Sequence, residues 1–302
     1  MTESVGNLLA PSDQIVGLVE NSATSIVAVH SGGRWPSSGI HWRSGVIVTA
    51  EETLERDENI DLVLPGGRQV EASLAGRDPT TDVAVLRFQP DGLPSAPTAD
   101  VPSRAGQIIL AVGSQGGGPL AALGIVAFAG GAWRSIRGGT IDSLIRLDLA
   151  LSAVGEGGAV IDLNGRVIGM TVLGPRRRVL AIPTATIDRS VDQLLAKGHV
   201  FRGYLGARLQ PLRRRGESGG SQSSVQPTGA LVASIDAAGP GARAGLLIGD
   251  IITTWNGKPV GRVREIMDLL GPESVGSSVD LGLLRGGSST ALKVVIGERP
   301  VT

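Results

Sequence analysis

The 302-residue sequence contains no cysteine, few aromatic side chains and no excess of charge of either sign. The absence of cysteine excludes disulfide bonds, thiol nucleophiles and thiolate metal sites. Aromatic residues make up only 3% of the chain, so its cores must be built from Val, Ile, Leu and Ala. The 28 basic and 28 acidic residues give a formal net charge of zero. Without a positive excess there is no global attraction to nucleic acid or anionic lipid, and we expect neither as a partner.

The sequence also lacks a long apolar run near its start. The first twenty residues, MTESVGNLLAPSDQIVGLVE, contain neither a basic segment nor an apolar stretch as long as a signal peptide or a membrane span. If Met1 is the natural start, a cytoplasmic location is expected. If a leader preceded this sequence, the expected location is periplasmic.

Glycine and β-branched residues are abundant, and they alternate in short runs. The 45 glycines and 17 prolines predict many turns. A chain of this length exceeds what one core usually organises, so we expect two domains. Strand-like runs without intervening helices favour a barrel or a pair of sandwiched sheets. These runs are 25–29, 45–50, 61–64, 69–74, 83–88, 108–112, 123–128, 143–151, 159–163, 166–173 and 179–182.

A helix is predicted after the last of these strands. Apolar residues at 187, 191, 194 and 195 recur on one helical face. Thr184 or Thr186 can cap its start, and Gly198 is a good stop. From about residue 200, further strand-like runs and a second short helix between Arg262 and Leu270 indicate a small α+β module.

Several segments of the chain match one known arrangement in order and spacing. They are Arg77–Phe88 (RDPTTDVAVLRF), Gly106–Gly113 (GQIILAVG), Ile145–Gly158 (IRLDLALSAVGEGG), Val179–Pro183 (VLAIP), Arg202–Ala207 (RGYLGA) and Gly249–Pro259 (GDIITTWNGKP). Together they resemble the HtrA/Deg family of trypsin-like serine proteases with a PDZ domain. The resemblance implies a mainly β fold: a chymotrypsin-like double six-stranded β-barrel over 1–198, followed by a small α+β PDZ domain over 199–302.

The resemblance also locates the positions of a Ser-His-Asp triad. The aspartate position is Asp82, whereas the histidine position holds Glu52 (or Glu51, if the match shifts by one residue) and the serine position holds Glu156. The glycine whose amide forms half of the oxyanion hole is replaced by Val154, just before Gly155, and a β-branched residue disfavours positive φ. The sequence therefore predicts a pseudoprotease that is not an enzyme.

Three carboxylates at the former triad allow other interpretations. If Glu52, Asp82 and Glu156 converge, they could share a divalent cation such as Ca²⁺, Mg²⁺ or Mn²⁺. No other cofactor is expected. Alternatively, two of them could share a proton and act as general acid and base, or the glutamates could face solvent or pair with Arg43 or another basic residue.

In the second module, the resemblance implies peptide binding. PDZ domains add an extended peptide to a sheet edge and take its terminal carboxylate on the amides of a short loop. That loop matches Tyr204–Leu205–Gly206–Ala207, and Ile266 is expected on the facing helix. The predicted function is thus a non-catalytic scaffold, adaptor or chaperone-like protein that binds polypeptide C-termini; the alternative is an enzyme, either an unconventional serine-type protease or the carboxylate site.

Two further expectations concern assembly and the histidines. The sequence does not decide whether the chain forms a homo-oligomer. The resemblance implies a trimer held by an aromatic-rich N-terminal segment, but this trimer is not expected here, because no aromatic residue precedes Trp35. His30, His41 and His199 are expected to be structural or surface residues rather than a displaced catalytic base.

Overall fold

The computed structural model describes residues 3–33, 36–90, 92–99, 101–135, 137–151, 154–198, 203–212, 229–271 and 274–298. The chain forms two compact units, Met1–Val200 and Phe201–Thr302. The predictions made for Trp35 and His199 concern positions outside the described residues.

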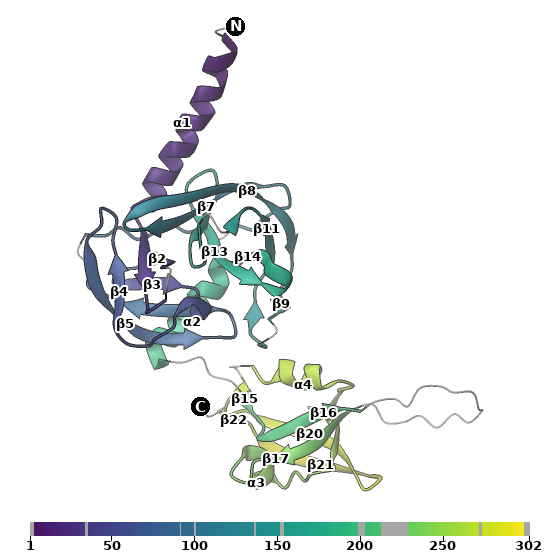
Figure 1. The fold of residues 1–302 in the computed structure, drawn as a ribbon. Helices are drawn as coiled ribbons and strands as arrows, with labels where there is room; N and C mark the ends of the chain where they lie inside the picture. The colour runs from purple at the N-terminus through teal and green to yellow at the C-terminus, as the bar shows by residue number, and fades with distance from the viewer. Residues whose placement is uncertain are drawn as a thin grey trace. The chain divides into compact units, whose positions relative to one another are not determined.

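Six antiparallel strands of the first unit close into a barrel in the order β1-β2-β3-β6-β5-β4 (Figure 1). Their short β-branched runs fill its interior with aliphatic side chains, as the scarcity of aromatic residues requires. The 3-10 helix η1 (Glu51–Thr53) follows the third strand. The strands are β1 (Ile26–His30), β2 (Ser37–Arg43), β3 (Val46–Thr49), β4 (Ile60–Val63), β5 (Gln69–Asp78) and β6 (Val83–Arg87).

A second closed barrel has the strand order β11-β14-β13-β12-β7-β8. A separate hairpin, β9 (Trp133–Arg134) with β10 (Thr140–Ile141), extends from it, and η3 (Pro175–Arg177) precedes the last strand. The predicted double six-stranded barrel is therefore confirmed. The strands are β7 (Ile108–Gln115), β8 (Gly118–Gly130), β11 (Leu144–Asp148), β12 (Ala159–Ile161), β13 (Val167–Gly174) and β14 (Arg178–Pro183).

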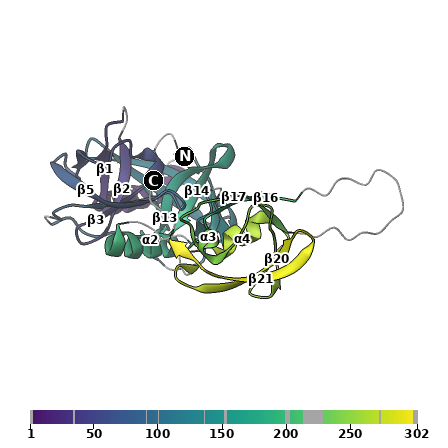
Figure 2. The same cartoon turned by 90° about the horizontal axis from the view of Figure 1, so that it is seen from below.

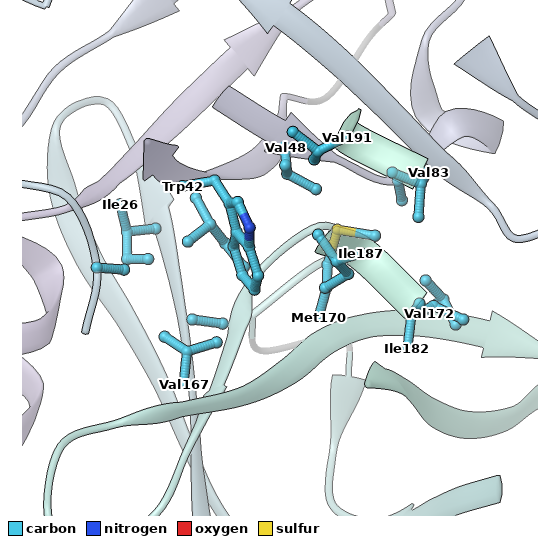
Figure 3. Packing of buried hydrophobic residues seen from close by; sticks show 14 of the residues in the cluster. Ile26, Trp42, Val48, Val83, Val167, Met170, Val172, Ile182, Ile187 and Val191 are labelled. Atoms are coloured by element: carbon cyan, nitrogen blue, oxygen red, sulfur yellow. The ribbon is translucent and has the colours of Figure 1, made fainter. Parts of the chain in front are cut away.

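Helix α2 (Thr184–Lys197) joins the two barrels through a shared core. Figure 3 shows its Ile187 and Val191 beside Met170 of the second barrel and Val48 of the first. Trp42 is the one aromatic side chain among the fully buried members of this cluster. Because both barrels and α2 contribute to one core, the cleft between the barrels is held by packing rather than by a flexible joint.

The ends of α2 differ in part from the prediction. Gly198 ends the helix in the left-handed conformation, with φ of 75°, as expected. At the start, however, no side chain caps the helix. Thr184 instead donates to the carbonyl of Ala99 (3.2 Å) and Thr186 donates to Asp142 (2.6 Å). These hydroxyls tie the helix to the second barrel, and that tertiary use outweighs local capping.

The first unit begins with a helix that we did not predict, α1 (Glu3–Ala23), which extends beyond the barrels in Figure 1. Its end is anchored because Ile15, Leu18 and Val19 pack against the shared core. Their i, i+3, i+4 spacing is the sequence signal that could have identified it. In the described part of the chain, no helix is both long and apolar enough to cross a bilayer.

The second unit is a PDZ-like α+β module with a sheet in the order β16-β17-β18-β20-β21, and β19 pairs with β18. Figure 2 shows α3 and α4 against this sheet. The predicted helix near Arg262–Leu270 is confirmed as α4. The elements are β15 (Gly203–Tyr204), β16 (Ala207–Pro211), β17 (Ala230–Ile235), α3 (Pro240–Ala244), β18 (Ile251–Trp255), β19 (Lys258–Pro259), α4 (Val263–Leu269), β20 (Ser278–Arg285), β21 (Ser288–Val295) and β22 (Gly297–Glu298).

Candidate functional site

Three turns bring the predicted triad positions together at the cleft between the barrels. Glu52 lies in η1, directly after β3, and Asp82 lies in the turn between β5 and β6. The Glu52 amide donates to Asp82 Oδ1 at 2.9 Å. Glu156 lies in the turn before β12, and its carbonyl accepts from the amide of Ser38 at 3.0 Å. These contacts place the three loops at one cleft.

Asp82 is an unusual carboxyl in two respects. Its φ of 58° is in the left-handed region, which aspartate tolerates better than most residues do. Burial, together with the nearby charges of Glu52, Glu156 and Glu51, raises the pKa of Asp82 to about 7, although the hydrogen bond from the Glu52 amide lowers it. At neutral pH this carboxyl is close to the midpoint of its titration.

The side chain of Glu52 is not free to bind a metal, because it pairs with Arg137 at 2.8 Å. Arg137 comes from the β9–β10 hairpin and also reaches buried Glu51 (3.3 Å), which Arg77 contacts from the other side (3.2 Å). Sequence reasoning missed Arg137, since nothing in its local pattern distinguishes it from any arginine in a turn. Its role follows from the folding of a second-barrel hairpin onto the first barrel.

The anticipated pairing of a triad glutamate with a basic residue is therefore present, but Arg43 is not the partner. Arg43 instead contacts Asp188 (2.8 Å) and Asp192 (2.5 Å) on α2. Both of these carboxylates are about half exposed or more, so the pairs contribute little to stability.

The third carboxylate is engaged by a backbone amide of the second barrel. Glu156 Oε2 accepts a hydrogen bond from the amide of Leu173 on β13 at 2.9 Å. Among the described residues, no group of three or more His, Asp or Glu side chains is placed to hold a metal ion. The geometry therefore gives the predicted divalent-cation site at Glu52, Asp82 and Glu156 no ligand set.

The loop before Glu156 is closed by its own hydrogen bonds. The amides of Val154 and Gly155 both donate to the carbonyl of Leu151, at 3.0 and 2.8 Å. The Val154 side chain is buried, whereas Gly155 and Gly157 have φ of 76° and 82°. Because the Val154 amide already has an acceptor within the loop, it does not point into the cleft as a free donor.

A pocket of about 330 Å³ lies between the barrels, next to Asp82. Its polar lining includes Glu52 and Asp82 of the first barrel and Ser135 and Arg137 of the β9–β10 hairpin. Its apolar lining comes mostly from this hairpin and from the second barrel. These apolar residues are Trp133, Ile141, Val172, Leu173, Pro175, Leu180 and Ile182.

In the second unit, the predicted loop Tyr204–Ala207 leads from β15 into β16, the edge strand of the sheet. Gly206 has φ of 72°, and any added Cβ would meet the backbone of Gly239. The Leu205 side chain is buried in the core of this unit. Within the described part of the chain, no backbone carbonyl accepts from the amides of Leu205 or Gly206.

One residue predicted for the peptide site lies elsewhere. Ile266 is fully buried in the core and has no exposed surface with which to contact a peptide. Met267 on the same helix is 44% exposed, and Val263, one turn before it, is half-buried. The correction is a shift of one position along α4, which a helical pattern of this length leaves ambiguous.

Comparison with known proteins agrees with both units. Residues 37–170 match the family model of the trypsin-like peptidase domain, and residues 203–296 match that of the PDZ domain. The first matched region lies within the barrel unit and the second lies within the α+β unit described above.

Curated relatives extend this likeness over both units. The chain is 33% identical over 265 residues to a probable periplasmic serine endoprotease, DegP-like, from Bartonella henselae, covering 85% of this chain and 52% of that protein. A protein of the same name from Halomonas elongata is 33% identical over 264 residues, with 85% and 55% covered. The chain thus spans about half the length of the curated relatives it matches.

Solved structures match over nearly their whole length. The serine endoprotease from Yersinia pestis aligns with a TM-score of 0.75 and 28% identity, covering 94% of this chain and 97% of that one. The HtrA-type protease AlgW with a tripeptide aligns with a TM-score of 0.71 and 26% identity, covering 95% and 98%.

These names correct two predictions made from the sequence. The prediction that the chain is not an enzyme is contradicted, because the proteins that share its sequence and fold are named serine endoproteases. That prediction depended on two side chains, at positions 52 and 156, whereas the similarity to named endoproteases extends over both units. The cytoplasmic location is contradicted as well, since the curated relatives are named periplasmic.

Two closed six-stranded barrels, a cleft at the triad positions and a PDZ unit thus agree with both family models and with the relatives. The chain belongs to the HtrA/Deg family of trypsin-like proteases with a PDZ domain.

Proposed function

We propose that this HtrA/Deg-family chain binds the C-terminal segment of polypeptides through its PDZ unit and holds them as a scaffold, adaptor or chaperone-like protein. The observation that carries this proposal is the exposed edge of β16 directly after the loop Tyr204–Ala207. An extended peptide can add to that edge, and the amides of Leu205 and Gly206 can donate hydrogen bonds to its terminal carboxylate. The similar protease AlgW has been solved with a tripeptide, which supports peptide binding here.

In this proposal the peptide lies between β16 and α4, which are neighbours in the second unit. Val263, Met267 and Leu270 follow one another at i, i+4 and i+7, so they form one stripe along the helix. Met267 is the exposed member of this stripe, and Leu270 is largely buried at its end. An apolar side chain of the bound peptide would pack against Met267.

The experiment compares two labelled peptides that differ only in a free or amidated C-terminus, by fluorescence polarisation with the full chain. The free-acid peptide should bind at least tenfold tighter, because only it has a carboxylate for the loop. Met267→Lys should weaken binding, whereas Leu269→Lys is the matched control, since Leu269 is equally exposed but lies on the other side of α4. Equal binding of both peptides, or equal loss in both variants, would exclude the proposed groove.

A second candidate function, peptide-bond hydrolysis at the inter-barrel cleft, is favoured by the titration of Asp82. A group with a pKa of about 7 can accept and release a proton under working conditions, as general acid–base catalysis requires. Turnover of unfolded casein by the full chain, and its loss in Asp82→Asn, is the measurement. Unchanged turnover in that variant would remove Asp82 from the reaction.

We also propose a periplasmic location, which the printed names of the curated relatives support. Cell fractionation followed by immunodetection of the full-length protein tests it. Recovery in the cytoplasmic fraction would contradict it.

A further inference from the structure

We propose that the tip of the β13–β14 hairpin, Arg176–Arg178, binds a condensed phosphate chain such as inorganic polyphosphate. None of these three arginines lines the pocket between the barrels, and the hairpin belongs to the barrel unit. The inference therefore goes beyond the peptide site proposed for the PDZ unit, and it does not depend on a reaction at the inter-barrel pocket.

The backbone of this tip is one that arginine rarely adopts. Gly174 pairs with Arg178, so Pro175, Arg176 and Arg177 close the hairpin. Arg176 has φ of 58° and ψ of 32°, and Arg177 has φ of 56°. The other described non-glycine residues with positive φ have short polar side chains that tolerate this region: Asn59, Asp82 and Asn256. Two consecutive arginines are strained there, and backbone strain of this kind is concentrated at ligand sites.

The positive charge of the tip is uncompensated. All three arginines are exposed, and in the part of the chain that the structure describes no carboxylate pairs with any of them. Other arginines of the barrel unit do pair with a carboxylate, within 3.1 Å: Arg43, Arg77, Arg137, Arg166 and Arg189. Like charges on consecutive residues repel one another, and a bound anion would remove that repulsion.

The close spacing of these charges favours a phosphate chain over other anions. Neighbouring Cα atoms are about 3.8 Å apart, so the three side chains start from a backbone segment shorter than about 8 Å. In an extended acidic peptide, successive side chains point to opposite faces, so only every second carboxylate could face the tip. A condensed phosphate carries a charge on every unit of its chain, and guanidinium groups bind phosphate oxygens through paired hydrogen bonds. The zero net charge of the chain argues against nucleic acid, which is bound by larger basic surfaces.

The test titrates the full chain with a short linear inorganic polyphosphate by calorimetry at low salt. The comparison ligands are orthophosphate, a single-stranded oligonucleotide and an oligoglutamate peptide with both ends capped. Capping removes the terminal carboxylate that the PDZ loop needs, so this peptide reports on its side chains alone. Polyphosphate should bind at least tenfold tighter than each comparison ligand. Salt at about 0.5 M should weaken its binding at least tenfold, because exposed charges are screened.

The decisive variant combines Arg176→Asn with Arg177→Gly, because Asn-Gly suits a left-handed turn. It should bind polyphosphate at least tenfold more weakly and yet melt at a higher temperature than the unaltered protein. The control, Arg104→Asn with Arg208→Asn, removes the same charge from exposed positions elsewhere and should keep the binding. No measurable binding of polyphosphate, equal or tighter binding of a comparison ligand, full affinity in the hairpin variant, or an equal loss in the control would each overturn the proposal. A lower melting temperature of the hairpin variant would overturn the strain on which the proposal rests.

Discussion

The backbone amide of Glu52 donates to the carboxylate of Asp82 at 2.9 Å, and this bond joins η1 to the turn between β5 and β6. It is the single described hydrogen bond of a carboxyl whose pKa is raised to about 7 by burial. The titration of Asp82 should therefore be visible in the stability of the barrel unit.

We expect the free energy of unfolding to fall as the pH rises through about 7. Asp82 holds its proton to a higher pH in the folded chain than in the unfolded chain, where its pKa is near 3.8. Its contribution is complete below pH 4 and is lost as the pH passes 7; it amounts to roughly 4 kcal/mol at most. Urea unfolding at pH 5, 6, 7 and 8 measures it.

Asp82→Asn should flatten this dependence and should exceed the unaltered protein in stability at pH 8, because asparagine carries no charge to desolvate. Asp61→Asn on the exposed strand β4 is the control and should leave the dependence unchanged. A pH profile that is the same in Asp82→Asn and in the unaltered protein would assign the dependence to other groups.

Arg77→Met should destabilise the barrel unit more than Arg43→Met does. Arg77 is 23% exposed and contacts Glu51, Asp57 and the carbonyl of Leu54. Its removal leaves the buried Glu51 carboxylate short of one partner, which costs about 2–3 kcal/mol.

Arg43 also contacts two carboxylates, but all three side chains are 41% exposed or more. Such surface pairs contribute about 0–1 kcal/mol, so Arg43→Met is the matched control. Denaturant unfolding of both variants measures the difference. Losses of equal size would show that burial of Glu51 does not control the strength of its ion pair.

In the turn around Glu156, Gly157→Ala should be more damaging than Gly155→Ala. Both glycines have positive φ, so each substitution carries a strain of about 1–2 kcal/mol. A Cβ on Gly157 would in addition overlap the carbonyl of Ser38, whereas a Cβ on Gly155 meets nothing within 4 Å. The thermal midpoint should therefore drop further for Gly157→Ala, and equal midpoints would mean that β2 moves aside without cost.

Ile187→Ala should lower the free energy of unfolding by about 2–5 kcal/mol, since it opens a cavity in a closely packed core. Ile187 is completely buried and lies beside Met170 and Val191 in the core that both barrels share (Figure 3). Val16→Ala on α1 serves as the comparison, because Val16 is 50% exposed. A small effect of Ile187→Ala would indicate that the surrounding side chains close the cavity.

The barrels could be predicted from the sequence because their strands carry local signals. Most are β-branched runs bounded by turn residues, as in Val83–Phe88. β2 (Ser37–Arg43) was missed because its sequence, SSGIHWR, has a low β propensity, and only its pairing with β1 and β3 makes it a strand. The dipeptide Asn164–Gly165 is a local turn signal of the same kind, and it lies between the paired strands β12 and β13, where Gly165 adopts positive φ.

The candidate site could be predicted only as far as its positions on the chain. Glu52, Asp82 and Glu156 were found from family motifs, and the structure places their loops together. The ion pair of Arg137 with Glu52 and the bond from the Leu173 amide to Glu156 could not be found. Both join segments from different parts of the chain, and side-chain direction depends on tertiary packing that no local pattern encodes.

Closure of the two barrels limits the surfaces through which copies of this chain can associate by strand pairing. A closed barrel has no edge strand with a row of unpaired amides, so the barrel strands of the first unit cannot pair with a strand of another copy. In the PDZ sheet, β16 is an edge strand. The backbone amides that would pair with a bound polypeptide C-terminus are the same amides through which the β16 strands of two copies could pair. A bound peptide would therefore block the β16 edge. The peptide-free protein should thus be more prone to self-association at high concentration.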